Sequence, residues 1–162
     1  MLVIGPDDFR RVLGHFATGV TIITTCDGDQ KPTGLTVSAF SSLSLDPPLV
    51  LACVDHKSQS YPALRESGRF AVNVLTTAQQ DISRRFATTR MDKFDGVPYR
   101  LGALGNPLIE GALAHLECVT VVAHVEGDHT IFIGRVEDCA AGAGEPLLYC
   151  RGKYGRLGGG PS

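Results

Sequence analysis

The sequence predicts a mainly β fold, a β-barrel with peripheral helices. Its 162 residues include 19 glycines and 9 prolines, a frequency typical of a chain with many turns. The segments that look like strands mostly follow one another directly instead of alternating with helices, which favours antiparallel pairing over a doubly wound sheet. Hydrophobic residues make up 43% and charged residues 20%, so the chain can bury a core.

The N-terminal part is expected to hold one helix and then strands. Apolar residues recur at helical spacing over residues 7–17, and Gly19 should end that helix. Residues 20–26 are dense in β-branched side chains and predict a strand. A second extended segment, rich in Ser and Thr, is expected over residues 33–45. The apolar run 49–54 then predicts a strand that is buried on both faces.

The middle of the chain is expected to alternate between helices and strands. Residues 46–48, Asp-Pro-Pro, break the extended segment because proline cannot donate to a β-ladder. Residues 58–66 predict a helix, residues 70–75 a buried strand, and residues 77–86 an amphipathic helix. A polar loop should follow over residues 88–98.

The C-terminal part predicts a long hairpin. Residues 112–126 and 129–138 are extended segments on either side of a glycine turn, and residues 147–150 can add a last strand. We expect one domain over residues 1–154 and a glycine-rich, disordered tail over residues 155–162.

Composition excludes several classes of function. The formal net charge of −2 gives no electrostatic basis for binding nucleic acid or an anionic membrane. The longest apolar run is far too short to span a bilayer, and the N-terminus lacks the basic segment of a secretory signal. The five cysteines are odd in number and form no Cys-x-x-Cys pair, which favours reduced thiols in the cytoplasm over disulfides or zinc.

Motifs for other chemistries are missing from the sequence. There is no dinucleotide fingerprint, no phosphate-binding lysine loop and no serine nucleophile elbow. His124 and His129 flank the predicted hairpin turn and could face each other, but no third ligand is close in the sequence. We therefore expect no metal site.

The positive signal is a hydroxyl-rich segment over residues 34–48. Hydroxyls recur along it at five positions: Thr36, Ser38, Ser41, Ser42 and Ser44. A solvated strand face is the plain explanation. Because the segment runs into the apolar strand 49–54, a polar ligand lying on the sheet explains it better, and hydroxyls and amides can bind the carbonyls of a flat heterocycle without adding charge.

Two cationic clusters follow this segment. Lys57 and Ser58 offer an ammonium and a hydroxyl at the start of a predicted helix, a combination suited to phosphate. An ordinary helix cap beside an exposed lysine is the alternative. Lys93 and Phe94 lie in the polar loop, where they could neutralise a phosphate and cover a ring, or simply belong to a solvated loop anchored by one aromatic side chain.

These segments together resemble the flavin reductase-like family, the short NAD(P)H:flavin oxidoreductases that serve two-component monooxygenases. The similarity covers nearly the whole chain in order and is most specific in the Ser/Thr-rich block that ends in Leu-Asp-Pro-Pro. The matching segments are residues 16–25, 34–54, 57–58, 70–75, 92–94, 127–129 and 146–154.

The resemblance implies a split-barrel homodimer that binds FMN or FAD near the subunit interface. It implies hydride transfer from NADH or NADPH to free flavin, and delivery of the reduced flavin to a separate flavin-dependent monooxygenase. The cofactor carries this chemistry, so no catalytic side chain is expected. Without a dinucleotide fingerprint, the nicotinamide nucleotide should be held weakly, and the flavin is expected to be a substrate or a loosely held cofactor. The alternative function is a non-reductase flavin- or haem-binding split-barrel protein.

The resemblance also implies roles for particular residues. Positions for the flavin ring and ribityl chain fall on Thr36, Val37, Ser38, Ser41 and Ser42. Positions along the chain and phosphate fall on Cys53, Lys57 and Ser58, with Lys93 and Phe94 closing the site. His129 and Tyr154 would face the nicotinamide. Ala39 stands where family members often have Ser, so one hydroxyl contact is in doubt.

Overall fold

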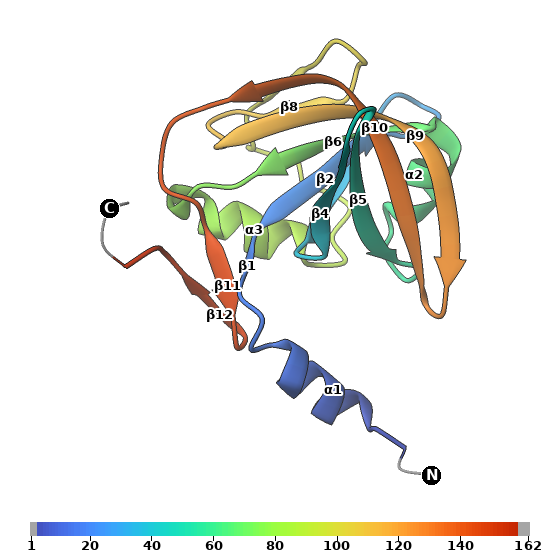
Figure 1. Cartoon of the computed structure of the whole chain (residues 1–162). Coiled ribbons are helices and arrows are strands. Elements are labelled where there is room, and N and C mark those ends of the chain that lie inside the picture. Colours follow the sequence, from blue (N-terminus) through green and yellow to red (C-terminus); the bar gives the residue numbers. More distant parts are fainter. Residues whose placement is uncertain (1–2, 159–162) are drawn as a thin grey trace.

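The computed structural model describes residues 3–158 and shows a curled β-sheet with helices outside it (Figure 1). The helices are α1 (Pro6–Leu13), α2 (Tyr61–Ser67), η1 (Thr77–Gln79) and α3 (Gln80–Phe86). The strands are β1 (Thr18–Gly19), β2 (Thr21–Cys26), β3 (Pro32–Val37), β4 (Phe40–Leu45), β5 (Pro48–Asp55), β6 (Arg69–Val74), β7 (Tyr99–Leu101), β8 (Pro107–Ile109), β9 (Ala114–Glu126), β10 (His129–Ala141), β11 (Leu148–Cys150) and β12 (Lys153–Gly155).

Seven strands form one antiparallel sheet in the order β3-β2-β6-β9-β10-β5-β4. Its two edge strands, β3 and β4, are consecutive in the chain and are joined only by Ser38 and Ala39. The sheet must therefore curl until its edges approach each other, as in a barrel. The Cys53 amide donates to the Ala39 carbonyl at 2.9 Å, so the connection stays attached to β5. This opening between β3 and the β4–β5 hairpin is called the split below.

The core lies on both faces of the sheet. One cluster fills the inside of the curl and includes Ile23, Phe70 and Phe132, and a second lies between the outer face and α3 and includes Ile22 and Phe86. Every residue of β2 is buried, because this strand has a sheet neighbour on each side and helices packed over it. The barrel thus forms a rigid wall behind the split.

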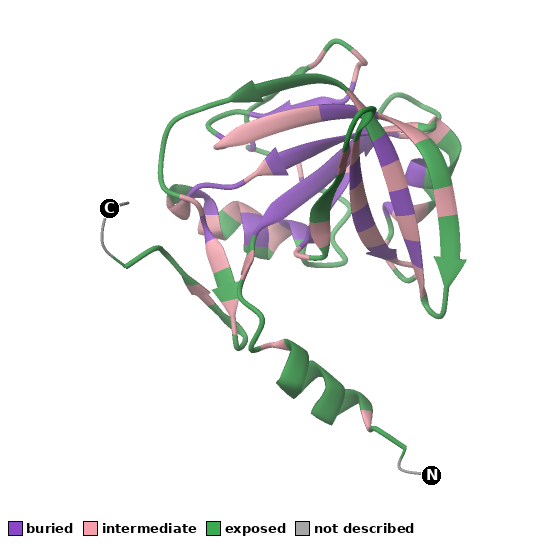
Figure 2. Ribbon diagram, in the orientation of Figure 1, coloured by how far each residue is buried: buried purple, intermediate pink, exposed green. Residues whose placement is uncertain are grey.

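Helix α1 stands apart from the barrel (Figure 1), and it is exposed along its whole length (Figure 2). It has no buried residue, although Phe9 and Val12 are both 58% exposed and lie on its apolar side. Exposed ion pairs between Asp7 and Arg10 and between Asp8 and Arg11 cover the polar side. Most tertiary stabilisation of a helix comes from packing an apolar face, and α1 obtains little of it within this chain.

The prediction of a mainly β fold is confirmed, with corrections to single elements. The N-terminal helix ends at Leu13 and not near Gly19, because Gly14 and the residues after it turn the chain toward β1, which pairs with β11. The extended segment 33–45 is two strands, because β3 pairs with β2 and β4 pairs with β5, on opposite edges of the sheet.

Strand β5 is not buried on both faces. Its residues alternate between buried and half-exposed, and Val50, Ala52 and Val54 point into the core. The opposite face looks onto a cavity described below, so its apolar side chains were mistaken for a second core face. The helix expected over residues 58–66 begins only at Tyr61, and the helix expected over residues 77–86 is divided into η1 and α3.

The long hairpin is confirmed as β9 and β10, with β-bulges at two places in their register. His129 lies opposite Glu126 and His124 opposite Ile131, so the two histidines do not face each other. The short strands β7, β8 and β12 were not predicted.

The last strand, β12, runs into the segment that was predicted to be a tail. Gly155 ends β12, while residues 159–162 of the expected disordered tail lie outside the described residues, so the division at residue 154 stays a prediction. Within the described part of the chain, no helix is long and apolar enough to cross a membrane.

Candidate functional site

Three adjoining cavities form one groove along the split. An apolar cavity of about 510 Å³ shares Ser38 and Tyr149 with a middle cavity of about 210 Å³. The middle cavity shares Thr36 and Ala87 with a polar cavity of about 250 Å³. The residues expected from the hydroxyl-rich segment thus line the walls where the cavities meet, and the groove changes in character from apolar to cationic along its length.

The apolar cavity lies between the β4–β5 hairpin and the chain around α1. Leu51 and Cys53 of β5 form one wall, with Phe40 and Ser41 of β4 beside them and Phe16 opposite. Burial raises the pKa of the Cys53 thiol, so it stays neutral. Such a cavity suits the body of a planar aromatic ligand, with polar groups only at its edge.

The middle cavity is lined by side chains that hydrogen bonds connect to one another. The Thr36 hydroxyl donates to the Ser83 carbonyl at 2.6 Å, and the Ser83 and Tyr154 hydroxyls are 2.8 Å apart. The Tyr154 ring meets Tyr149 edge-on, with 5.4 Å between ring centroids, and the Arg84 guanidinium lies 5.5 Å from the Tyr154 centroid. Strand β12 therefore fixes an aromatic wall against α3.

The polar cavity is lined by Lys57 and Ser58 on one side and by Thr88 and Thr89 on the other. A tight turn presents the first pair: the Asp55 carboxylate accepts from the Lys57 amide at 2.8 Å, and the Asp55 carbonyl accepts from the Ser58 amide at 3.0 Å. The Thr88 hydroxyl donates to the Arg85 carbonyl, so the donors left for a phosphate are the Lys57 ammonium and the hydroxyls of Ser58 and Thr89. Helix α2 begins beyond this turn, so Ser58 is not its cap.

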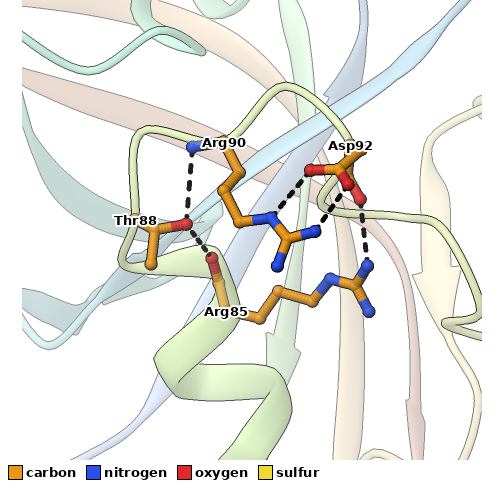
Figure 3. Close-up of polar contacts among 4 residues, drawn as sticks. All are labelled: Arg85, Thr88, Arg90 and Asp92. Carbon is orange, nitrogen blue, oxygen red and sulfur yellow. Dashed lines mark hydrogen bonds and ion pairs between the residues drawn. The ribbon is translucent and has the colours of Figure 1, made fainter.

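The loop beyond Thr88 is held by its own ion pair (Figure 3). Arg90 donates to the two carboxylate oxygens of Asp92 at 2.8 and 2.6 Å, and Arg85 donates to the Asp92 carbonyl at 3.2 Å. The hydrogen bond from Arg90 lowers the pKa of the Asp92 carboxyl from 3.8 to about 2. Thr88 donates to the Arg85 carbonyl at 2.7 Å, which ties the loop back to α3.

Lys93 and Phe94 take up positions that the sequence did not indicate. Lys93 is buried, and its ammonium donates to the carbonyls of Gly34 and Phe86 at 3.1 and 3.2 Å. Burial lowers the pKa of Lys93. Phe94 packs edge-on against Phe86 and Tyr99. Lys93 lines the polar cavity, whereas Phe94 lines a small adjacent cavity.

The remaining expected residues lie outside the lining of the groove. Val37 is buried and its carbonyl accepts from the Thr21 hydroxyl at 2.7 Å. Ser42 is exposed on β4. His129 is half-exposed at the hairpin turn, with its Nδ1 2.7 Å from an Asp128 carboxylate oxygen, and it pairs with Asp55 beside the polar cavity. In the described chain, His129 is therefore near the cationic end of the groove without lining it.

Several lining residues were missed at the sequence level. Phe16 and Ser83 line the groove, and each comes from a segment that was predicted as a helix without a site role. Phe16 was counted among the apolar residues of the first helix, although it is 75% exposed. The one signal for Ser83 is its place on the α3 face that packs on β3, which depends on the tertiary fold.

The curled sheet and the groove along the split define the class of protein: a β-barrel that binds a small molecule at the split. The family model for the flavin reductase like domain matches residues 13–158, and the chain belongs to this family.

Relatives of this chain match it over most of their own length. A flavin-dependent monooxygenase reductase subunit, HsaB, from Mycobacterium tuberculosis is 47% identical over 93% of this chain and 82% of its own. An NADH-dependent flavin reductase from a Rhodococcus species is 39% identical over 95% of this chain and 88% of its own. The structure of the Streptomyces globisporus NADH:FAD oxidoreductase SgcE6, in complex with NAD and FAD fragments, superimposes with a TM-score of 0.89 at 40% identity, covering 98% of both chains.

Proposed function

We propose that this protein is an NAD(P)H:flavin oxidoreductase that reduces free FMN or FAD and supplies the reduced flavin to a separate monooxygenase. The observation that carries the proposal is the groove at the split, which is apolar at one end, hydroxyl-lined in the middle and cationic at the other. That order matches the ring, the ribityl chain and the phosphate of a flavin nucleotide. Relatives named as flavin reductases and as a monooxygenase reductase component support the reaction and the partner.

The residues of the groove fit such a ligand. A bound flavin supplies the chemistry, because its ring accepts a hydride from a nicotinamide without a protein nucleophile. Leu51, Cys53 and Phe40 would exclude water from the ring, and Ser38 lies where the apolar and middle cavities meet. Lys57 and Ser58 would hold the phosphate. The protein therefore acts by orienting its two substrates and excluding water, and orientation alone removes much of the barrier.

A second copy of the chain completes the protein in this proposal. Support comes from the N-terminal segment, where Phe9, Val12 and Phe16 are more than half exposed, and from Leu45 at the tip of the β4–β5 hairpin, which is 95% exposed. Phe16 also lines the apolar cavity, which would otherwise open to water. We expect the wild type to sediment as a dimer and Val12→Asp to shift it toward the monomer. A wild type that sediments as a monomer would count against the homodimer.

Flavin should be a substrate or a loosely held cofactor, since the groove is an open surface channel. Gel filtration in dilute buffer should separate flavin from protein, and stoichiometric co-elution would contradict loose binding.

The five cysteines are all free thiols, which supports the expected reducing compartment, the cytoplasm.

The reaction is tested by stopped-flow absorbance with FMN or FAD and NADH or NADPH. We expect loss of the visible flavin absorbance at a rate proportional to enzyme, and the four combinations establish which nucleotides are used. Flavin binding without nicotinamide oxidation in any combination would favour the alternative, a non-reductase flavin-binding barrel. A haem titration with no Soret shift would exclude the haem-binding form of that alternative.

A further inference from the structure

A buried hydroxyl on β10 joins three elements next to the polar cavity. Thr130 is fully buried, and its hydroxyl lies 3.0 Å from Nε2 of His56 and 2.9 Å from the Tyr61 hydroxyl. A threonine hydroxyl has one proton and two acceptor sites, so it can satisfy both partners at once. These three residues, His56, Tyr61 and Thr130, are called the triad below.

The triad ties β10 to the stretch of chain between β5 and the start of α2. Thr130 belongs to β10, Tyr61 begins α2, and His56 lies in the turn that follows β5. The His56 and Tyr61 rings are also in contact, with 4.9 Å between centroids, and Tyr61 meets Phe132 edge-on at 6.2 Å. The His56 amide donates to the Asp128 carbonyl at 3.0 Å, which attaches the same turn to the β9–β10 hairpin turn.

The residues directly after His56 are Lys57 and Ser58, which line the polar cavity. The Lys57 side chain is exposed, and the turn is held locally by the two hydrogen bonds to Asp55. Ser58 also accepts from the Ser60 amide at 3.3 Å and from the Tyr61 amide at 3.1 Å. The turn is therefore flanked by His56 and Tyr61, and the direction in which it presents its ammonium and hydroxyl depends on how the Thr130 hydroxyl holds these two residues. A shift of about 1 Å at such a turn is enough to weaken a bound anion strongly.

We infer that the triad is a positioning device for the anion-binding turn: through His56, the Thr130 hydroxyl fixes Lys57 and Ser58 in the orientation that receives the phosphate of the flavin nucleotide. This inference rests on the proposed function for the identity of the anion. It assigns no contact with the ligand to His56, Tyr61 or Thr130, which act through the two residues of the turn.

The test compares a ligand with the phosphate and one without it. Affinities for FMN and for riboflavin are measured by calorimetry on the full chain for the wild type, Thr130→Val and Tyr61→Phe. Removing the Thr130 hydroxyl should weaken FMN binding about fivefold or more, the equivalent of one hydrogen bond, and leave riboflavin binding within about twofold. Tyr61→Phe should act in the same direction with a smaller effect. Thr130→Ser, which restores the hydroxyl, should recover most of the FMN affinity.

Thr24→Val is the matched control. Thr24 is also fully buried, and its hydroxyl donates to the Pro107 carbonyl at 2.5 Å, away from the groove. It should lower stability as Thr130→Val does, yet leave the ratio of FMN to riboflavin affinity unchanged. Circular dichroism and urea unfolding confirm that each variant is folded at the assay temperature.

The outcomes separate this inference from the proposed function. An unchanged affinity ratio in a folded Thr130→Val variant, or an equal loss for riboflavin, would overturn the positioning role while leaving flavin reduction intact. A wild type that binds none of riboflavin, FMN and FAD would instead overturn the proposed function.

Discussion

Replacing Lys57 with methionine tests the cationic end of the groove directly. Methionine keeps most of the length and apolar stem of the side chain and removes its charge, so the change isolates the ammonium. Lys57 lines the polar cavity, and the other lysine there, Lys93, is already bonded to two backbone carbonyls. Of the lysines in the described groove, Lys57 is therefore the one whose ammonium is expected to meet a phosphate.

The expected magnitude follows from burial. A hydrogen bond to a charged group contributes about 1.5 to 3 kcal/mol, and the Lys57 side chain is exposed, which places it at the low end. A loss of about 1.5 kcal/mol corresponds to a roughly tenfold higher Kd for FMN. Because the site is open to solvent, the difference should shrink as ionic strength rises.

The assay is calorimetric titration of FMN and riboflavin into wild type and Lys57→Met at two salt concentrations. The matched control is Lys31→Met, which removes an exposed lysine near the turn between β2 and β3. An FMN Kd unchanged within error, or an equal loss of riboflavin affinity, would refute the assignment of the phosphate to this turn.

Three further predictions concern other parts of the site and its frame. His129→Ala should raise the nicotinamide KM more than the flavin KM in steady-state kinetics, because the half-exposed imidazole lies outside the lining of the flavin groove and is open to a second nucleotide. The Asp92 carboxyl should titrate near pH 2 by NMR, and Arg90→Ala should return its pKa toward 3.8; since the folded pKa is depressed, the contribution of this ion pair is present above pH 3.8 and is lost as pH falls toward 2. Gly102→Ala should destabilise the protein by about 1 to 3 kcal/mol in urea unfolding, because a Cβ there would overlap the carboxylate of the buried Glu117.

Each of these has its own contrary result. Equal changes in both KM values would remove His129 from the nicotinamide site. An Asp92 carboxyl that titrates at 3.8 in the wild type would show that the Arg90 pair does not persist in solution. Gly28→Ala is the control for Gly102, since a Cβ at Gly28 meets nothing within 4 Å, and equal effects at the two glycines would contradict the overlap.

The strands were predictable wherever β-branched or alternating patterns were strong. Residues 20–26 and the hairpin over residues 112–138 were placed to within a few residues, because their apolar side chains are required on one face whatever the partner strand. The same reasoning failed at β5, where the apolar residues of one face line a cavity and not the core. Hydrophobicity alone does not distinguish a core face from a ligand-binding face.

The candidate site was partly predictable for a similar reason. Thr36, Ser38 and Ser41 stand out because hydroxyls are unusual next to an apolar strand, and all three line the groove. The position of Lys93 was not predictable from the polar loop in which it lies. A lysine in a polar loop is normally solvated, but here two carbonyls at 3.1 and 3.2 Å hold it inside the protein, and no local sequence signal reports the distant carbonyl of Gly34.

By itself, the sequence determined the class of fold and the type of chemistry at the site, since turn residues, β-branched runs and a row of hydroxyls are local properties of the chain. Tertiary structure decided where that chemistry lies. Only the curling of the sheet brings its edge strands β3 and β4 together at Ser38 and Ala39, opens the groove between them, and places Tyr149 and Tyr154 against α3. Contacts between residues this far apart depend on strand order and register, which the periodicity of a single segment does not contain.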